Sequence, residues 1–258
     1  MSIHPTAVID PQARLAAGVR VGPYAVIGPE VEIGEETDVG AHVVIEGPTR
    51  VGRRNRIFPF TSIGLIPQDL KFRGERSEVI IGDDNRIREF VSIHRGTEGG
   101  GSLTRIGNAN LLMAYVHIAH DSLLGDHTIL GNGATLAGHV LIEDHATVGA
   151  FVGVHQFCRI GRHAFIGGYS VITQDVLPFS RTVHERGARV YRVNIVGLRR
   201  RGFEEPRIER LHQAMRLLTQ SKLNTSQALE KIRETLDQDD DLAALVRFVE
   251  SAERGIIK

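Results

Sequence analysis

Residues 112–142 read LMAYVHIAHDSLLGDHTILGNGATLAGHVLI and place an aliphatic side chain at every sixth position. These positions are Leu112, Ile118, Leu124, Leu130, Leu136 and Ile142. A period of six is neither the helical period nor the simple alternation of a long strand. Repeats of this length are typical of a parallel β-helix, in which three hexapeptides complete one coil.

The six-residue register extends through most of the chain. It runs from Ile3 to Ile63, resumes from Ile81 to Ile93, and continues from Ile106 to Ile172. Each aliphatic residue should point inward and stack on its equivalent one coil, or three hexapeptides, away. Successive coils would lie about 4.8 Å apart, the spacing of hydrogen-bonded strands. We therefore predict a mainly β protein with a parallel β-helix over residues 1–178.

Two interruptions break the register, near residues 65–79 and 96–104. The first spans as many residues as a whole coil and contains Gln68, Asp69 and Lys71. The second is rich in glycine and polar residues. Because an inward register is not broken without cost, both segments are expected to be loops that leave the wall. Loops held on a rigid scaffold commonly carry function.

A helical pattern replaces the repeat towards the C-terminus. Residues 179–202 are expected to form an irregular connector, and residues 203–258 a C-terminal α-helical domain that caps or flanks the open end of the coil. One apolar stripe consists of Ile208, Leu211, Met215 and Leu218. Asn224 with Gln227 resembles a capping box, and the acidic run at 239–241 can cap a further helix.

The composition narrows the possible partners. The 258 residues include 31 Lys+Arg and 31 Asp+Glu, so no global charge indicates binding to nucleic acid or to an anionic membrane. The single cysteine, Cys158, cannot form an intrachain disulfide. The N-terminus lacks a signal-peptide pattern, and no run of about 18 uncharged apolar residues indicates a transmembrane segment. We expect a cytoplasmic protein.

The coil length predicts that several polar residues share one edge. Gly138 follows His120 by three hexapeptides, and His155 follows Ala137 by the same interval. Each pair should therefore occupy equivalent places on neighbouring coils. The histidines expected along this edge are His117, His120, His139 and His155.

His120 is predicted to be a general base. Asp121 supplies an adjacent carboxylate, and Gly138, without a side chain, would bring its backbone N–H close to a developing oxyanion. No nucleophile is evident, because Cys158 is interpreted as a small packed thiol.

Two other interpretations of the histidines stay open. They can be wall or subunit-contact residues, which is what we expect of His127, His145 and His163. They can also be zinc ligands, since neutral imidazole suits that metal, but such a site generally needs three of them to converge.

Several motifs resemble those of one known family, the UDP-N-acetylglucosamine O-acyltransferases of lipid A biosynthesis. Members of that family move a 3-hydroxyacyl chain from acyl carrier protein to the sugar 3-hydroxyl. The resemblance covers nearly the whole chain. The motifs are Gln68-Asp69-Leu70-Lys71, Ile93-His94-Arg95-Gly96-Thr97, His117-Ile118-Ala119-His120-Asp121, Leu136-Ala137-Gly138-His139-Val140, Val154-His155-Gln156-Phe157 and Gly197-Leu198-Arg199-Arg200-Arg201-Gly202-Phe203.

The resemblance implies a homotrimer of left-handed β-helices with active sites in the clefts between subunits. His120 would take the proton from the sugar hydroxyl, Asp121 would orient His120, and the N–H of Gly138 would bind the oxyanion. Neither a metal nor another cofactor is implied.

Substrate-binding roles are also implied. The residues concerned are Gln68, Asp69, Lys71, His117, His139, His155, Gln156, Asn194 and Arg200. Gly168 resembles the position that limits acyl length, and a glycine there would leave the groove long. Acyl carrier protein is acidic, and either a docking patch or a solvated face can explain a local basic cluster. That cluster is Arg189, Arg192, Arg199, Arg200 and Arg201.

Two features depart from the family pattern. The segment 179–193 lacks the customary Gln-Gly-Asn, and Val196 stands where members often have a glutamate that contacts the nucleotide. Two other functions therefore stay open. One is a hexapeptide N-acyltransferase that acts on a 3-amino sugar nucleotide, and the other is a trimeric scaffold without catalysis.

Overall fold

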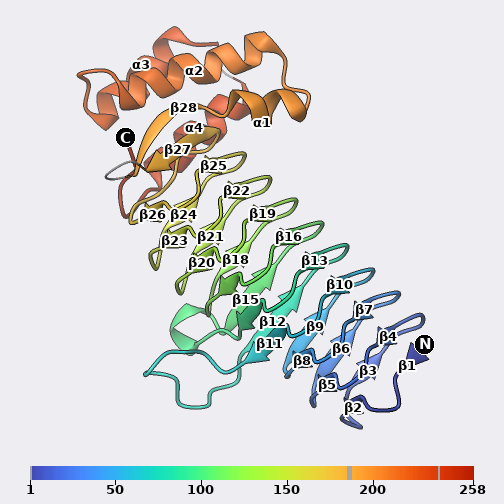
Figure 1. Cartoon of the computed structure of the whole chain (residues 1–258). Helices are drawn as coiled ribbons and strands as arrows, with labels where there is room; N and C mark the ends of the chain where they lie inside the picture. The colour runs from blue at the N-terminus through green and yellow to red at the C-terminus, as the bar shows by residue number, and fades with distance from the viewer. Residues whose placement is uncertain (1, 185–187, 238) are drawn as a thin grey trace.

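The chain folds into a left-handed parallel β-helix that is followed by a group of helices, as predicted (Figure 1). The computed structural model describes residues 2–184, 188–237 and 239–258. Short strands pair in parallel with strands one coil away. Ser2 pairs with Arg20 and Ile129 with Thr147, so the regular coil consists of three hexapeptides.

Three sheets form the three faces of the coil, and we call them A, B and C. Sheet A contains, in spatial order, β1 (Ser2–Ile3), β4 (Arg20–Val21), β7 (Asp38–Val39), β10 (Arg56–Ile57), β13 (Arg86–Ile87), β16 (Leu111–Leu112), β19 (Ile129–Leu130), β22 (Thr147–Val148), β25 (Phe165–Ile166), β27 (Ser180–His184) and β28 (Ala188–Val193).

Sheet B contains β2 (Val8–Ile9), β5 (Val26–Ile27), β8 (Val44–Ile45), β11 (Ser62–Leu65), β14 (Ser92–His94), β17 (His117–Ile118), β20 (Thr135–Leu136), β23 (Gly153–Val154) and β26 (Val171–Ile172). Sheet C contains β3 (Arg14–Leu15), β6 (Val31–Ile33), β9 (Thr49–Val51), β12 (Glu78–Ile81), β15 (Leu103–Ile106), β18 (Leu123–Leu124), β21 (Leu141–Ile142) and β24 (Arg159–Ile160). The chain runs from A to B to C, so we name the corners AB, BC and CA.

The residue at every sixth position fills the interior of the coil. In sheet B, for example, these side chains are almost fully buried and stack in one column: Ile27, Ile45, Ile63, Ile93, Ile118 and Leu136. Burial of one such side chain contributes about 1.5–3 kcal/mol, and its repetition specifies the register. The scaffold that positions the corners is therefore rigid.

Both interruptions of the repeat leave the coil at corner BC. The first lies between β11 and β12, and the second, which contains a short 3₁₀ turn (Glu98–Gly100), lies between β14 and β15. Across the first, Val51 pairs with Ile81, so the loop adds twelve residues to the three hexapeptides of a regular coil. The first loop is therefore shorter than the whole coil that the sequence suggested. The reason is that β12, on sheet C, belongs to the same coil as β11, on sheet B. Across the second, Ile81 pairs with Ile106, so that loop adds seven.

The segment expected to be an irregular connector is mostly regular. β27 pairs in parallel with β25, β28 pairs antiparallel with β27, and α1 (Ile195–Arg200) follows. The last strand of a sheet leaves N–H and C=O groups unpaired, and the hairpin covers that edge of sheet A. Residues 185–187 of the atypical segment lie outside the described residues.

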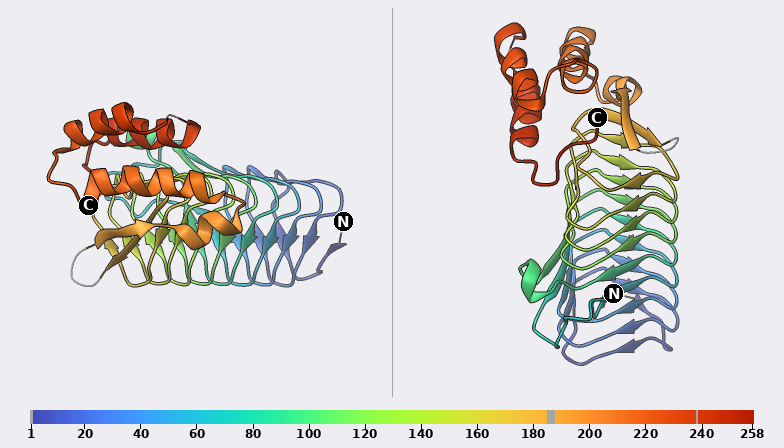
Figure 2. Two further views of the ribbon diagram at one scale, coloured as in Figure 1. Left: turned by 90° about the horizontal axis from the view of Figure 1, so that it is seen from above. Right: turned by 90° about the vertical axis from the view of Figure 1, so that its left-hand side faces the viewer.

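The helices α2 (Glu205–Thr219), α3 (Thr225–Thr235) and α4 (Asp240–Glu250) gather at the C-terminal end of the coil (Figure 2). The apolar stripe predicted around Leu211 and Met215 is the buried face of α2. The capping box of Asn224 and Gln227 begins α3, and Asp239 caps α4, both as predicted. None of the described helices has the length and apolar character that a membrane span requires.

Candidate active site

The candidate site lies at corner BC, where three successive coils present polar residues. His120 follows β17, Gly138 and His139 follow β20, and His155 follows β23. The N–H of His139 donates to the carbonyl of His120, at 3.0 Å. A Cβ atom built on Gly138 would lie 2.5 Å from Cε1 of His120, so the imidazole covers this glycine. The predicted stacking of His120 on Gly138 is confirmed.

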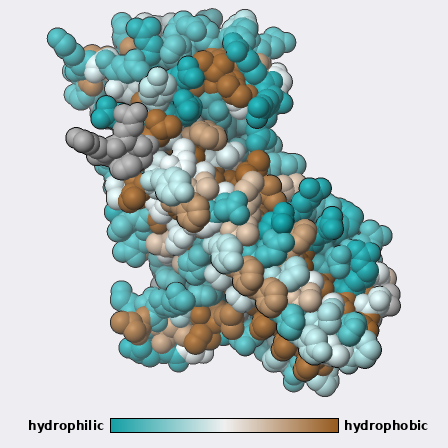
Figure 3. Space-filling model, viewed as in Figure 1, coloured by the Kyte–Doolittle hydropathy of each residue, from teal (hydrophilic) through white to brown (hydrophobic). Residues whose placement is uncertain are grey.

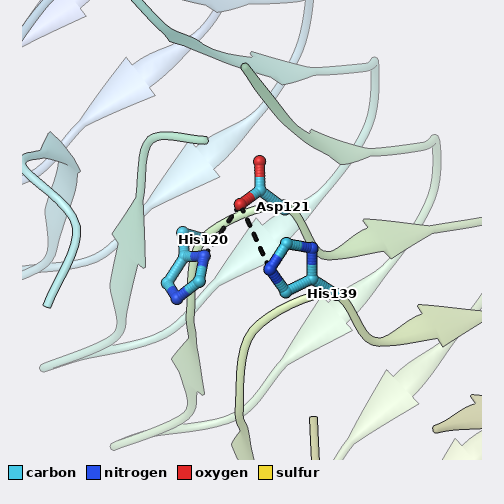
Figure 4. Close-up of side chains that lie close together, drawn as sticks. All are labelled: His120, Asp121 and His139. Atoms are coloured by element: carbon cyan, nitrogen blue, oxygen red, sulfur yellow. Dashed lines mark hydrogen bonds and ion pairs between the residues drawn. The ribbon is translucent and has the colours of Figure 1, made fainter. Parts of the chain in front are cut away.

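His120 and Asp121 form a hydrogen-bonded pair (Figure 4). Nδ1 of His120 lies 2.8 Å from Oδ2 of Asp121, whose side chain is completely buried. A carboxylate only accepts, so Nδ1 carries a proton and Nε2 is the ring nitrogen that Asp121 does not engage. Asp121 has a φ of 60°, a left-handed conformation that aspartate tolerates better than most residues. The pair therefore leaves Nε2 of His120 as the nitrogen that can accept a proton from a substrate.

His139 packs beside this pair. Its Nε2 lies 3.8 Å from Oδ2 of Asp121, and its ring meets the His120 ring edge to face at 5.1 Å. On its other side, His139 stacks on the half-exposed ring of Phe157 at 4.4 Å. Burial lowers the pKa of His139 more than Asp121 raises it, which favours the neutral ring. Phe157 lay within a quoted motif but was not singled out.

His117 begins β17, the strand that leads directly to the pair, and has its own partners. Its Nδ1 lies 2.8 Å from Oγ of Ser92, and its ring meets the buried ring of His94 at 5.0 Å. Burial lowers the pKa of His117, and proximity to His120 adds to the effect. Burial, with His117 and His120 nearby, lowers the pKa of His94 to about 4. Sequence reasoning missed Ser92 and His94, although His94 stands in the motif beside Arg95.

The two loops enclose a cavity of about 370 Å³ against corner BC. Asp69 and Lys71 of the first loop, Thr97 of the second loop, and His139 and Phe157 of the coil all line it. The structure thus brings Asp69 and Lys71 to the predicted site.

Other predicted residues of this edge lie outside that cavity. Gln68 is an exposed residue of the first loop. His155 and Gln156 are exposed at corner BC one coil beyond Gly138, and Nδ1 of His155 lies 3.1 Å from the carbonyl of Gln156.

Asn194 and Arg200 line a different cavity, of about 620 Å³, near corner CA. The side chain of Asn194 accepts from the N–H of Gly197 and donates to the carbonyl of His163, at 3.0 Å. His145 and several arginines also line this cavity: Arg181, Arg192, Arg200 and Arg201. Within one chain, the structure does not bring these residues to His120.

Three further predictions concern Gly168, Cys158 and the basic cluster. Gly168 lies at corner AB, between β25 and β26, and is exposed. Cys158 is fully buried, and burial raises the pKa of its thiol to about 11, which confirms a packed and unreactive cysteine. In the basic cluster, the guanidinium of Arg199 is already paired with Glu205 at 2.6 Å. Val196, the residue that departs from the family pattern, is exposed and lines the second cavity with Arg200.

Among the described residues, His120, Asp121 and His139 are the group whose ligand atoms lie close enough to hold a metal, all within 4.8 Å of one another. However, Nδ1 of His120 bonds to Oδ2 of Asp121, and both carboxylate oxygens accept from Thr97. A metal ion would have to replace these hydrogen bonds, so the donor set fits a proton-transfer pair better than a zinc site.

Comparison with known proteins connects this geometry to one family. The family described as UDP N-acetylglucosamine O-acyltransferase, domain 2, matches residues 175–257. Bacterial transferase hexapeptide repeats match residues 12–47, 103–138 and 139–174.

Full-length relatives agree with these matches. The acyl-[acyl-carrier-protein]–UDP-N-acetylglucosamine O-acyltransferase of Halorhodospira halophila is 50% identical over 256 residues, which cover 99% of each chain. The enzyme of that name from Myxococcus xanthus is 48% identical, again over 99% of each chain. The crystal structure of the UDP-N-acetylglucosamine acyltransferase of Bacteroides fragilis is similar at a TM-score of 0.97, with 42% identity and 99% coverage of both chains. With such similarity over its whole length, this chain belongs to the family of acyl-[acyl-carrier-protein]–UDP-N-acetylglucosamine O-acyltransferases.

Proposed function

We propose that this chain transfers a 3-hydroxyacyl group from acyl carrier protein to the 3-hydroxyl of UDP-N-acetylglucosamine, the first step of lipid A biosynthesis. The names of its full-length relatives support this acyltransferase activity. The observation that carries the proposal is the pair of His120 and Asp121, which leaves a basic nitrogen beside the backbone of Gly138.

The pair can perform the reaction by general-base catalysis. Nε2 of His120 takes the proton as the sugar hydroxyl attacks the thioester carbonyl carbon. The N–H of Gly138 makes no backbone hydrogen bond within the described part of the chain, so it is available for the oxyanion. When the intermediate collapses, the carbon–sulfur bond breaks and the carrier thiolate takes the proton back from His120. No covalent enzyme intermediate is needed.

The cavity residues fit roles in substrate binding. Lys71 offers a positive charge. Asp69 and the neutral imidazole of His139 can form hydrogen bonds with the hydroxyl groups of the sugar or of the acyl chain. His117 presents a further imidazole from the preceding strand. Gln68, His155 and Gln156 lie at the same corner and extend the proposed binding edge along the coil.

We further propose that the enzyme is a homotrimer whose active sites lie between subunits. A column of stacked rings runs along corner AB, and its members are largely exposed in the single chain: Tyr24, His42, Phe60, Phe90 and Tyr115. The single chain also exposes apolar side chains on the coil (Figure 3). Contiguous exposed apolar surface of this kind marks contact sites.

The subunit arrangement would also explain the second cavity. Asn194 and Arg200 would bind the nucleotide phosphates at the His120 site of a neighbouring subunit, since they do not reach it in their own chain. Gly168 is proposed to limit acyl length in the same cleft. Arg189, Arg192 and Arg201 supply exposed or partly exposed positive charge for docking of acidic acyl carrier protein. We place the reaction in the cytoplasm, the compartment expected from the sequence.

Product analysis tests the activity directly. Purified protein is incubated with UDP-N-acetylglucosamine and a mixed pool of 3-hydroxyacyl carrier-protein thioesters, and the products are weighed by mass spectrometry. We expect one ester of defined acyl length. His120→Ala should lower kcat by about 10²-fold or more, because it removes the general base. As a control, the His120→Ala variant should keep the assembly state and the melting temperature of the parent protein.

Each alternative gives a different result in the same experiment. Acylation of a 3-amino sugar nucleotide in preference to the 3-hydroxy sugar would indicate an N-acyltransferase, for which Val196 is the motivating departure. Full turnover by His120→Ala would show that this residue is not the general base. If the parent protein gave no turnover, the result would favour a trimeric scaffold without catalysis. Stoichiometric zinc in the active protein would contradict the metal-free mechanism.

A further inference from the structure

The second loop binds both oxygens of the Asp121 carboxylate. The backbone N–H of Thr97 donates to Oδ1 of Asp121 at 2.8 Å, and Oγ of Thr97 donates to Oδ2 at 2.6 Å. Oδ2 is also the atom that accepts from Nδ1 of His120. Thr97 is 6% exposed. A single buried threonine thus supplies two of the hydrogen bonds that hold the partner of the proposed base.

Two glycines of the same loop pack directly against this carboxylate. A Cβ atom on Gly100 would lie 2.0 Å from Cγ of Asp121, and one on Gly96 would lie 2.8 Å from Oδ1. Both distances are shorter than real contacts, so a side chain on Gly100 would displace Asp121, and one on Gly96 would first meet the backbone of Ser102 and Leu103. The loop therefore surrounds the carboxylate with backbone.

Hydrogen bonds within the loop hold Thr97 in place, and the strand that follows the loop binds the backbone of Asp121. The N–H groups of Gly100 and Ser102 donate to the carbonyl of Thr97, at 3.0 and 2.7 Å. Oγ of Thr104, at the start of the next strand, accepts from the N–H of Asp121 at 2.9 Å. Asp121 is thus held through both its backbone and its side chain, and its carboxylate has little freedom to rotate.

We propose that Thr97 is a positioning residue for the acyl transfer, a role that rests on the proposed function of His120 as general base. By holding Oδ2 against Nδ1 of His120, Thr97 keeps the proton on that nitrogen and directs the lone pair of Nε2 towards the substrate. A carboxylate that rotated freely would let the other tautomer form, with Nε2 protonated and unable to accept a proton. The insertion that the second loop makes in the coil supplies this restraint.

Substitution of the hydroxyl tests the role while the fold is kept. Thr97→Val retains shape and the backbone N–H but loses the charge-assisted bond, so kcat should fall about tenfold or more while KM changes little. Thr97→Ser restores the hydroxyl and should recover kcat to within about threefold of the parent. Thr61→Val is the matched control, because Thr61 is equally buried and bonds to the carbonyls of Phe58 and Arg88 away from the site. It should leave kcat unchanged.

A double-mutant cycle separates positioning from a general structural effect. In an Asp121→Asn background the carboxylate is gone, so Thr97→Val should cost less than about threefold in kcat. An equal loss in both backgrounds, or a rise in KM with constant kcat, would overturn the proposal. So would a Thr97→Ser variant as slow as Thr97→Val.

A measurement without turnover separates this proposal from the proposed reaction. The imidazole nitrogen NMR shifts of histidine-labelled protein report which nitrogen of His120 is protonated, and His120→Gln identifies the signal. We expect the Nε2-protonated form to appear in Thr97→Val but not in Thr97→Ser. If the parent enzyme made no ester, the function would fail, whereas an unchanged tautomer in Thr97→Val would refute the positioning role alone.

Discussion

Histidine has two distinct physical roles in this coil. At corner BC, His120 has a carboxylate partner and a free nitrogen. At corner CA, His127, His145 and His163 stack with centroid spacings of 5.0 and 4.7 Å, and Phe179 covers the last ring at 5.6 Å. The stacking supports the interpretation of these histidines as wall residues, and a role in subunit contacts stays a prediction. Asp126 and Asp144 also stand beside His127 and His145 in the sequence. What distinguishes His120 is that its ring bonds to Asp121 and covers Gly138.

The buried His163 should make the protein less stable in acid. Burial, aided by nearby His145 and Arg201, lowers its pKa to about 3 from an ordinary value of 6.5. Between these values the unfolded chain binds the proton and the folded chain does not, so stability falls as pH decreases from about 6.5, by up to about 1.4 kcal/mol per pH unit. Above pH 6.5 the effect is absent.

His163→Phe should weaken this pH dependence. Phenylalanine occupies the same left-handed corner position at Phe151 and Phe157, and it keeps the stack between His145 and Phe179. Urea midpoints at pH 8 and pH 5, at one protein concentration, measure the change. The variant should lose less stability at pH 5 than the parent does. Equal losses would show that His163 does not carry the acid sensitivity.

At the scale of the element, the corners of the coil depend on polar side chains as much as on apolar ones. A ladder of buried amides follows corner CA, where Nδ2 of Asn85 donates to Oδ1 of Asn55 at 3.0 Å and Oδ1 of Asn85 accepts from the N–H of Asn110 at 2.9 Å. All three asparagines are at most 1% exposed. The ladder continues the hydrogen bonding of the sheets around the turn.

Removal of one member of this ladder should be costly. Asn85→Ala leaves the N–H of Asn110 and the carbonyl of Gly107 without their partner, and two unsatisfied buried groups should lower the free energy of unfolding by about 2–4 kcal/mol. Urea denaturation measures the loss. Asn108→Ala, at an exposed asparagine of the same corner one coil further on, is the control and should cost less. Similar costs at both sites would mean that the ladder adds nothing specific.

The ladder also shows which elements could be predicted from sequence. The aliphatic register alone predicted the coil, because one inward residue per hexapeptide recurs from Ile3 to Ile172. Asparagine at a corner has no such signal, since its burial depends on partners one coil away. The hairpin of β27 and β28 was missed for a similar reason. It forms because the edge of sheet A needs a partner, and this need is a property of the assembled sheet.

At the scale of the whole molecule, the candidate site was only partly predictable. Stacking at an interval of three hexapeptides placed Gly138 beside His120, because the coil converts sequence distance into spatial distance. The contribution of Thr97 was not predicted, since a loop inserted into the coil has no periodic position. Nor does the repeat indicate that Asn194 and Arg200 line a cavity apart from His120. The proposed sharing of sites between subunits would account for that separation.

Shared sites predict complementation between two inactive variants. In the proposed trimer, each site would combine the His120 face of one subunit with the Arg200 face of its neighbour. His120→Ala and Arg200→Ala are each expected to be slow alone. When they are unfolded together and reassembled as mixed trimers, about a quarter of the sites should receive both intact faces by random assortment. Activity should rise towards that fraction of the parent value, whereas mixing without reassembly should leave it unchanged. If reassembled mixed trimers stayed as slow as the separate variants, His120 and Arg200 would have to act within one chain, and the cavity of Asn194 would need another ligand.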